Sequence, residues 1–148
     1  MSSASPRVAY TRLAADAFKG LLAASHAVHE SSIGQDLMEL VFLRVSQLNG
    51  CGYCMDMHGT ALRKAGIEPR KLDTLPAWHE SRFFDARERA ALGWAEALTR
   101  LPDGAPSEAA FEALAAHFDD KGIADLSMGV AVINAWNRLG AGLLPPLP

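Results

Sequence analysis

The segment from Leu37 to Leu48 limits the possible folds of this chain most, because it is apolar on nearly every side of the helix that its spacing predicts. Such a helix lies at the centre of a domain or between subunits, since it has no broad face suited to water. Glu39 interrupts the apolar run, and a buried carboxylate needs a partner or takes up a proton. A structural ion pair with Arg44 or Arg138 would satisfy it, as would a place on the narrow polar stripe of the helix.

Helical spacing of apolar residues continues along the rest of the chain, and no convincing strand interrupts it. A β-branched run at 130–133 is short and flanked by residues of helical spacing, so we interpret it as buried helix. Because there is no internal repeat, linker or break in composition, residues 1–148 are predicted to form one domain. The sequence therefore predicts an all-α, single-domain bundle of six or seven helices, at about 14–30, 33–48, 51–65, 69–75, 85–101, 106–118 and 122–139.

The predicted helix ends coincide with residues that cap or stop helices. The dipeptide "NG" at 49–50 is a typical C-terminal stop, and Pro69 suits a first helical position. Asp85, with Glu88 three residues later, has the pattern of a capping box. Ser107 is expected to cap the helix that follows it. Each of these residues satisfies or removes a backbone group that has no partner inside the helix, which is why they mark the boundaries.

Charge and composition argue against several classes of function. The 148 residues carry a formal net charge of -3, and the basic residues are scattered among acidic ones. A nucleic-acid groove needs clustered basic residues interleaved with aromatic ones, so none is expected. The N-terminal stretch lacks the apolar core of a secretory signal, and the longest apolar run, 127–136, is too short to span a bilayer. We expect a soluble cytoplasmic protein without nucleic-acid or membrane partners.

Both cysteines of the chain lie in the stretch "LNGCGYCMDMHG" at 48–59. In a reducing compartment such a pair is more often catalytic, redox-active or metal-binding than a structural disulfide. If a helix begins at Cys51, then Cys54 and His58 share one face with it at positions i, i+3 and i+7. A helix N-terminus and a nearby base both favour the thiolate form of cysteine. The helix terminus favours Cys51 as the more acidic thiol, whereas His58 is one turn from Cys54 and two turns from Cys51.

Other interpretations of this stretch stay open at this point. A zinc ion could bind the two cysteines and His58, with Glu39 or Asp56 as fourth ligand, although structural zinc sites ordinarily use a second close pair of ligands. A thioredoxin-like redox site is expected beside a βαβ unit, for which the sequence offers no convincing strand. The two thiols could also be buried and inert.

With its surroundings, the stretch "ELVFLRVSQLNGCGYCMDMHG" resembles the core motif of the alkylhydroperoxidase D-like (AhpD-like) proteins, within the carboxymuconolactone decarboxylase superfamily. The shared pattern is a glutamate twelve residues before the first cysteine, then C-x-x-C, then a histidine four residues after the second cysteine. In this chain these residues are Glu39, Cys51, Cys54 and His58. The core motif occupies 33–66, and the likeness continues through 78–99 and 133–140.

The resemblance implies an all-α, thiol-dependent peroxidase that assembles into homo-oligomers, as a trimer or hexamer. Cys54 would attack the peroxide, and Cys51 would then close the disulfide. Glu39 and His58 would form the proton relay. The resemblance implies no metal and no organic cofactor, but it implies a dithiol electron donor such as a lipoyl protein or a thioredoxin-like protein.

Two other functions are alternatives to the peroxidase. Decarboxylases of the same superfamily do not rely on a C-x-x-C pair, so the cysteines argue against that activity. The alternative from another class is a redox-sensing or partner-binding module, in which the Cys51–Cys54 disulfide switches a surface and turnover is small.

The chain departs from the better-studied branch of this family at Tyr53, where that branch has a histidine directly before the second cysteine. A tyrosine, with a pKa of about 10, is a poor proton shuttle at neutral pH. The relay would therefore run without that group, or the substrate would differ. The other polar and aromatic candidates are interpreted as surface, core or interface residues without a catalytic role: His26, His29, His79, His117, Asn134, Asn137, Arg138, Trp78, Trp94 and Trp136.

Overall fold

The structure is a computed structural model that describes residues 5–144 and Leu147. Within this part of the chain there are eight α-helices and two short 3-10 helices, and no residue lies in a strand. The α-helices are α1 (Tyr10–Leu13), α2 (Ala15–His29), α3 (Gln35–Asn49), α4 (Gly52–Lys64), α5 (Pro69–Asp73), α6 (Ala86–Thr99), α7 (Glu108–Ala115) and α8 (Asp120–Leu143). The 3-10 helices are η1 (Leu75–Glu80) and η2 (Leu101–Asp103). The all-α prediction is confirmed, with α2 to α8 in the predicted places and α1 as an addition.

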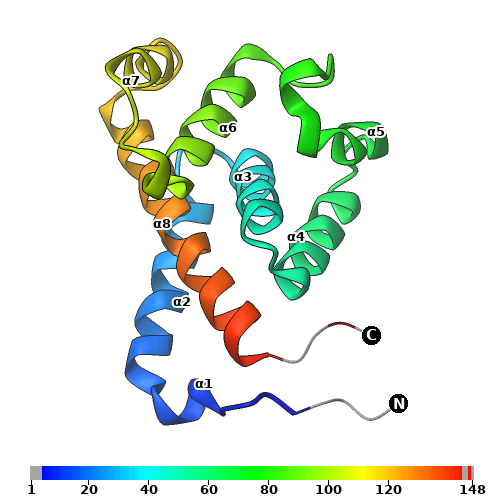
Figure 1. Ribbon diagram of the computed structural model, residues 1–148, viewed down its shortest axis with the longest axis vertical. Coiled ribbons are helices and arrows are strands. Elements are labelled where there is room, and N and C mark those ends of the chain that lie inside the picture. Colours follow the sequence, from blue (N-terminus) through cyan, green and yellow to red (C-terminus); the bar gives the residue numbers. More distant parts are fainter. Residues whose placement is uncertain (1–4, 145–146, 148) are drawn as a thin grey trace.

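Helix α3 lies at the centre of the bundle, and α4, α6 and α8 pack around it (Figure 1). Met38, Val41 and Val45 have no exposed surface, and Phe42 is 1% exposed. Each side chain of this kind stabilises the fold by about 1.5–3 kcal/mol when it leaves water. The prediction that the apolar segment at 37–48 forms a central helix is confirmed.

The helix ends follow the capping residues that the sequence contains. Gly50 takes a left-handed conformation, with φ of 66°, and ends α3. Pro69 occupies the first turn of α5, and the Ser107 side chain caps α7. The capping box of α6 is formed, because the Asp85 carboxylate accepts from Glu88 N–H at 2.8 Å and Glu88 accepts from Asp85 N–H at 2.9 Å. These predicted boundaries are confirmed.

The last helix is longer than the sequence suggests. It was expected to end at about Leu139, before two glycines, but α8 continues through Gly140 and Gly142 to Leu143. Glycine ends a helix by adopting a positive φ, and neither of these glycines does so. The reason for glycine at 140 is a close contact with the cysteines, described below.

A buried ion pair joins α3 to α6 and η1. Arg44 Nε and Trp78 Nε1 both donate to Glu96 Oε1, at 2.7 and 2.8 Å. Burial by itself raises the pKa of the Glu96 carboxyl, but the hydrogen bonds from Trp78 and Arg44 outweigh it and lower the pKa. Arg44 is five residues from Glu39, which is about 140° around α3, so the two side chains point apart. The expected pair between Glu39 and Arg44 is therefore wrong.

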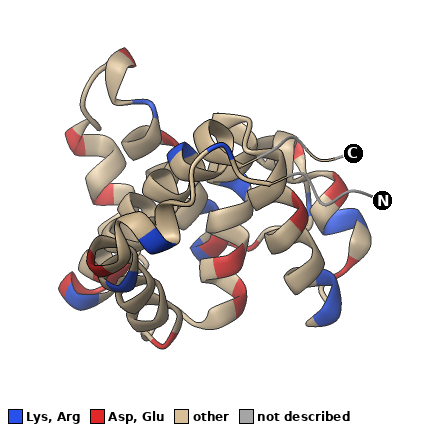
Figure 2. Cartoon of the chain, turned by 90° about the horizontal axis from the view of Figure 1, so that it is seen from below, with Lys and Arg blue, Asp and Glu red and all other residues tan. Residues whose placement is uncertain are grey.

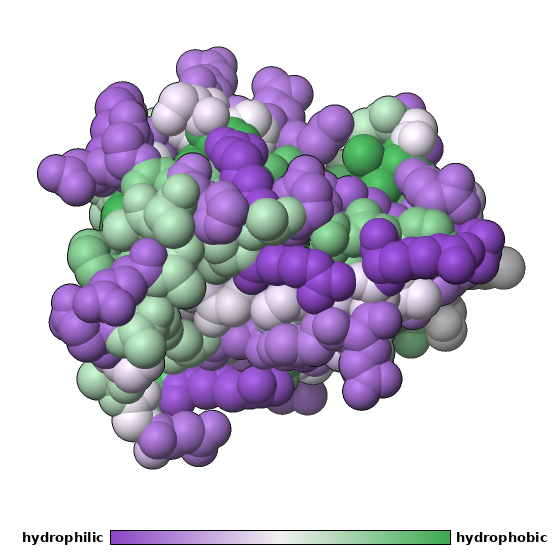
Figure 3. Space-filling view, turned by 90° about the horizontal axis from the view of Figure 1, so that it is seen from above, coloured by the Kyte–Doolittle hydropathy of each residue, from purple (hydrophilic) through white to green (hydrophobic). Residues whose placement is uncertain are grey.

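The surface of the molecule is mixed in character. Acidic and basic residues are interspersed along the described helices (Figure 2). The end of the molecule far from the two termini shows many hydrophilic side chains and, on the left of the view, a broad area of moderately hydrophobic ones (Figure 3). Among the described residues, no helix has the combination of length and hydrophobicity needed to cross a membrane.

Gly129 marks a close approach of α8 to α3 and gives a test of the packing. A Cβ atom at Gly129 would lie 2.5 Å from Met38 Sδ, and Met38 is fully buried. We expect Gly129→Ala to lower the free energy of unfolding by about 1–3 kcal/mol, because the core has to move to admit the methyl group. Urea unfolding curves measure this change.

Gly20→Ala in α2 is the matched control. A Cβ atom at Gly20 would meet no other atom within 4 Å. Alanine is the better helix former, so this variant is expected to gain about 0.5–1 kcal/mol. If Gly129→Ala were as stable as the wild type, Met38 would have room to shift and the contact would not be tight.

Candidate active site

The C-x-x-C pair lies at the tight junction between α3 and α4. Gly50 turns the chain, and Cys51 follows as the N-cap of α4, in an extended conformation. Cys51 Sγ accepts a hydrogen bond from Cys54 N–H at 3.3 Å. The two cysteines form a disulfide, and their Cα atoms are 5.3 Å apart. The predicted helix start at Cys51 is confirmed, and it places both sulfur atoms at a helix N-terminus.

Helix α8 passes directly against the two sulfur atoms at Gly140. A Cβ atom there would lie 2.8 Å from Cys51 Sγ and 3.0 Å from Cys54 Sγ. Only a residue without a side chain allows this approach, which explains the glycine inside the helix. The contact also helps to bury both cysteines, of which Cys51 is 0% and Cys54 3% exposed.

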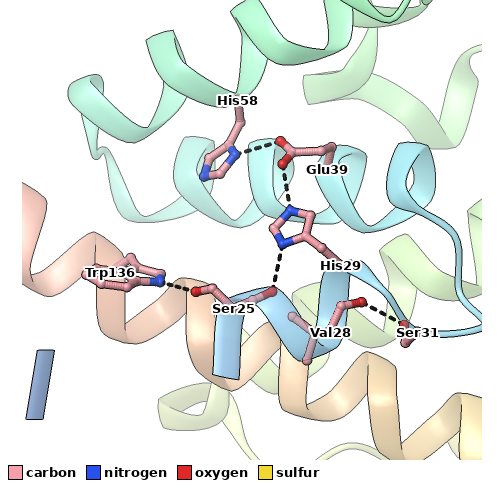
Figure 4. A network of polar contacts seen from close by, with 7 residues as sticks. All are labelled: Ser25, Val28, His29, Ser31, Glu39, His58 and Trp136. Atoms are coloured by element: carbon pink, nitrogen blue, oxygen red, sulfur yellow. Dashed lines mark hydrogen bonds and ion pairs between the residues drawn. The ribbon is translucent and has the colours of Figure 1, made fainter. Parts of the chain in front are cut away.

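Glu39 of α3 binds two histidines, one through each carboxylate oxygen (Figure 4). Oε2 is 2.7 Å from His58 Nδ1 on α4, and Oε1 is 2.6 Å from His29 Nε2 on α2. The expected alternative partner, Arg138, instead donates to Asn134 on its own helix. Glu39 therefore connects three helices through histidines, and the arginine partners considered from the sequence are both wrong.

One ring nitrogen of His58 is occupied and the other is free. The ionised Glu39 carboxylate can only accept, so His58 Nδ1 carries a hydrogen, and in the neutral ring Nε2 then carries the lone pair. Nε2 is buried and has no hydrogen-bond partner among the described residues. Phe42 packs edge-on against the imidazole, with the ring centroids 5.3 Å apart. The site thus contains an unpaired basic nitrogen on the face of α4 that also carries Cys54, one turn earlier.

The charge on Glu39 is stabilised by its two partners. Burial by itself raises the pKa of this carboxyl, but the hydrogen bonds and charges of His29 and His58 outweigh burial and lower the pKa to about 2. The pKa of His29 is raised, mainly by its hydrogen bond to Glu39. Glu39 is consequently an anion at neutral pH, and the position of its charge is fixed between two imidazoles.

His29, which was interpreted from the sequence as a residue without a catalytic role, has an unexpected hydrogen-bond partner in Glu39. It lies ten residues from Glu39 in sequence and on another helix, so no local spacing connects the two. Its Nδ1 contacts the backbone oxygen of Ser25 at 2.8 Å, and Trp136 Nε1 donates to Ser25 Oγ at 2.6 Å. The one signal in the sequence is that Leu21, Ser25 and His29 line up on α2, and Leu21 packs against the core.

The asparagines of α8 form a separate cluster with α3. Asn49 Nδ2 donates to the side-chain oxygens of Asn134 and Asn137, each at 2.9 Å. Asn137 Nδ2 donates to Ser46 Oγ at 2.9 Å, and Asn137 is 1% exposed. Buried amides with these partners stabilise the contact between α3 and α8, which agrees with the structural role expected for them.

A cavity of about 550 Å³ opens beside Cys54. Glu39, His29 and His58 belong to its wall, and Cys54 does so whereas Cys51 does not. The N-terminal segment forms another part of the wall and is tied to the end of α8, where Arg7 N–H donates to the Leu143 oxygen at 2.8 Å. Most of the lining is apolar or aromatic, and it includes Tyr10, Phe18, Leu22, Phe42, Met57 and Trp136. A cavity of this size and character suits a small organic molecule.

The zinc interpretation gains no support from the geometry. In the part of the chain that the structure describes, no three side chains of His, Cys, Asp or Glu are grouped as metal ligands. Both oxygens of Glu39 are bonded to histidines, and Asp56 is exposed.

This chain is similar to known proteins in its sequence and to solved structures in its fold. The sequence profile of the Carboxymuconolactone decarboxylase family matches residues 13–97. The uncharacterized protein YdfG of Bacillus subtilis (strain 168) is 33% identical over 139 residues, which cover 94% of this chain and 95% of YdfG. ATU0492 from Agrobacterium tumefaciens, a protein of unknown function and a candidate AhpD antioxidant defence protein, has a TM-score of 0.88 and 32% identity over 97% of this chain and 100% of its own.

Two further solved structures show the range of proteins with this fold. An uncharacterized peroxidase-related protein with an alkylhydroperoxidase AhpD core, from Ralstonia eutropha JMP134, has a TM-score of 0.80 and 25% identity over 96% of this chain and 77% of its own. The debrominase Bmp8, in complex with 2,3,4-tribromopyrrole, shares the fold alone, with a TM-score of 0.74 and 24% identity over 86% of this chain and 66% of its own. From the profile match and the full-length likeness to YdfG and ATU0492, this chain belongs to the carboxymuconolactone decarboxylase family and has the AhpD-like fold.

Proposed function

We propose that this protein is a thiol-dependent peroxidase that reduces an organic hydroperoxide with the Cys51–Cys54 pair. The observation that best supports the proposal is that Cys54, His58 and Glu39 all lie in the wall of one apolar cavity. The candidate antioxidant role of ATU0492 and the peroxidase-related protein with an AhpD core support the same class of activity.

The first step is the oxidation of a thiolate by the peroxide. In the reduced protein, His58 Nε2 takes the proton of the Cys54 thiol, and Glu39 holds the imidazole through Nδ1 and leaves Nε2 without another hydrogen-bond partner. The Cys54 thiolate attacks the terminal oxygen of the hydroperoxide, so that an S–O bond forms and the O–O bond breaks. The departing alkoxide takes the proton from His58, which leaves an alcohol and a sulfenic acid on Cys54.

The second step closes the disulfide and releases water. Cys51 sulfur attacks the sulfenic sulfur of Cys54; the S–S bond forms and the S–O bond breaks, and the thiol proton of Cys51 leaves with the hydroxide as water. An external dithiol, such as a lipoyl protein or a thioredoxin-like protein, then reduces the disulfide by exchange. The cycle therefore needs a reducing compartment such as the cytoplasm.

Access to the cavity supports this order of the two cysteines. Cys54 belongs to the cavity wall and is followed one turn later by the free nitrogen of His58. Cys51 has no exposed surface and lies behind the wall, against Gly140. Its N-cap position favours a thiolate at Cys51, since Cys54 N–H donates to this sulfur, and that property suits a resolving thiol as well.

The surroundings of the cavity bear on substrate and assembly. Its apolar and aromatic lining favours a hydroperoxide with a hydrocarbon group over hydrogen peroxide. The proposed homo-oligomer, a trimer or hexamer, would cover apolar side chains that a single chain leaves exposed near the cavity, among them Val8, Leu22, Tyr53, Met55 and Met57.

Oxidation of the reduced protein by one equivalent of an organic hydroperoxide tests the activity. We expect both thiols to disappear rapidly and the intact mass to fall by that of two hydrogens, because the pair closes a disulfide within one chain. Free-thiol assays and mass spectrometry over seconds to minutes follow the reaction, with the urea-unfolded chain as the control for intrinsic cysteine reactivity.

The alternative is a redox-sensing or partner-binding module that the same disulfide switches. The buried sulfur atoms favour it, since slow access would limit turnover. In that case the protein would be oxidised but would consume little hydroperoxide with any dithiol. Thiols that persist, or that react no faster than in the unfolded chain, would exclude a peroxide-tuned site and favour other substrates, as the fold also serves a debrominase.

A further inference from the structure

The ring of His29 faces a hydrogen-bond acceptor at each of its nitrogens (Figure 4). Nδ1 lies 2.8 Å from the backbone oxygen of Ser25, which can only accept, so Nδ1 carries a hydrogen. Nε2 lies 2.6 Å from Glu39 Oε1. A hydrogen bond at this distance needs one further proton, held either by Nε2 or by the carboxyl oxygen.

The two possible places of that proton give the same net charge. If Nε2 holds it, His29 is an imidazolium beside a carboxylate; if Oε1 holds it, both groups are neutral. The lowered pKa of Glu39 and the raised pKa of His29 favour the charged pair. In either state the proton shared with His29 balances the negative charge of Glu39, without any contribution from His58.

The balance matters because His58 is bonded to the other oxygen of the same carboxylate, at 2.7 Å. An unbalanced carboxylate strongly favours the protonated form of an imidazole that is bonded to it, and in that form neither ring nitrogen can accept a proton. Beside a balanced carboxylate, His58 can remain neutral and accept a proton from the Cys54 thiol. A positive charge at His29 also favours the thiolate form of a nearby cysteine.

Within residues 5–144 and Leu147, no other cation lines the cavity and could balance this charge. Among the described residues that line it, none is a lysine or an arginine. The ionisable residues of the lining come from four helices. Helix α1 contributes one tyrosine, α2 one histidine, and α3 one glutamate. Helix α4 contributes a tyrosine, a cysteine and a histidine, whereas α8 contributes no ionisable residue. In that order the ionisable lining residues are Tyr10, His29, Glu39, Tyr53, Cys54 and His58.

We infer that His29 is a positioning residue that balances the charge of Glu39 and thereby keeps His58 an uncharged base and Cys54 readily ionised. This role rests on the proposed function of Cys54 as the attacking thiol. It extends the relay from two residues to three, His29–Glu39–His58, with its third member on α2.

Alkylation of Cys54 by iodoacetamide, a neutral reagent, tests the inference without any peroxide. The reduced Cys51→Ser protein is compared with Cys51→Ser/His29→Gln from mildly acidic to alkaline pH. Glutamine can still donate to Glu39 but carries no charge, so we expect the midpoint of alkylation to rise by about one pH unit. At neutral pH the reaction becomes roughly tenfold slower, and the two rates converge at alkaline pH, where the Cys54 thiol is ionised in both proteins.

His26→Gln is the matched control, because His26 is an exposed histidine on the same helix and lies outside the cavity wall. It is expected to leave the alkylation profile unchanged. Equal midpoints with and without His29, or a slowing by the same factor at every pH, would overturn the inference, since a merely structural role gives no shift with pH.

An NMR titration of the wild-type imidazoles decides the question if the double variant does not fold. The inference requires His29 to keep both ring protons to a higher pH than an ordinary histidine; loss of one proton at or below the ordinary value would overturn it.

The proposed peroxidase activity and the inferred role of His29 can fail separately. A shifted midpoint in a protein that does not react with peroxide would leave the inference standing and remove the peroxidase, and an unshifted midpoint in an active peroxidase would do the reverse.

Discussion

Cys54→Ser is expected to abolish the rapid reaction with organic hydroperoxide, and Cys51→Ser is expected to leave a sulfenic acid on Cys54. The difference follows from the positions of the two sulfur atoms. Cys54 belongs to the cavity wall, as does His58 one turn later on α4, whereas Cys51 is wholly buried and does not line the cavity. A peroxide in the cavity therefore meets Cys54 first. Without Cys51 the sulfenic acid has no partner in the chain and persists.

Dimedone, which reacts with sulfenic acids, measures this outcome by mass spectrometry after a single addition of hydroperoxide. The Cys51→Ser protein should be labelled on Cys54, and the Cys54→Ser protein should be neither labelled nor oxidised. Each variant is the control for the other, because both remove one thiol from the same short helix start. Labelling of Cys51 in the Cys54→Ser protein would reverse the proposed roles.

Glu39→Gln is expected to slow the oxidation of Cys54 by about a hundredfold, the lower end of what a positioned acid–base group contributes. The substitution removes the negative charge but keeps both hydrogen bonds. The amide oxygen can accept from His58 Nδ1–H, and the amide nitrogen can donate to a neutral His29. The relay loses the charge that stabilises a protonated His58, while the helices stay connected. Stopped-flow measurement of thiol loss gives the rate.

Glu96→Gln is the matched control for this variant. Glu96 is also a nearly buried carboxylate with strong partners, Arg44 and Trp78, but it lies outside the cavity wall. It should lower the free energy of unfolding and leave the oxidation rate unchanged. If Glu39→Gln instead loses helicity or precipitates, Glu39 is a structural residue and the relay fails.

Acid unfolding gives a second measurement on Glu39→Gln, with a defined sign. The pKa of Glu39 is about 2 in the folded protein, below its ordinary value of 4.5. Its ionised form therefore stabilises the fold fully above pH 4.5, and this contribution is lost as pH falls toward 2. The difference in free energy of unfolding between wild type and Glu39→Gln should shrink within this window. A difference that is independent of pH there would mean that the carboxylate does not have the lowered pKa.

Local features of the fold were predictable because they depend on neighbours in sequence. The caps at Asp85 and Ser107 bond to backbone groups three residues away, and Gly50 turns the chain at its own position. Both partners of each contact therefore lie close together in the sequence. The shared face of Cys51, Cys54 and His58 follows in the same way from the helical repeat. Glu39 was recognised through a motif, and the structure places it next to His58.

The contacts that complete the site depend on how whole helices pack. His29 reaches Glu39 only because α2 lies against the end of α3, and a spacing of ten residues between different helices carries no signal of its own. The arginine partners expected for Glu39 were wrong for the same reason, since the direction in which α3 is turned decides which side chains meet. Gly140 is read from the sequence as a helix stop, although its function is to let α8 approach two sulfur atoms.

The sequence alone thus determines most of the helices and most of their ends, the thiol pair and its nearest base. The tertiary structure decides which charges balance one another, which cysteine borders the cavity and what encloses that cavity. The physical reason is the distance along the chain over which each kind of interaction acts. Backbone hydrogen bonds and helical periodicity act over a few residues, whereas the relative positions of α2, α3, α4 and α8 are set by the burial of apolar side chains from the entire chain.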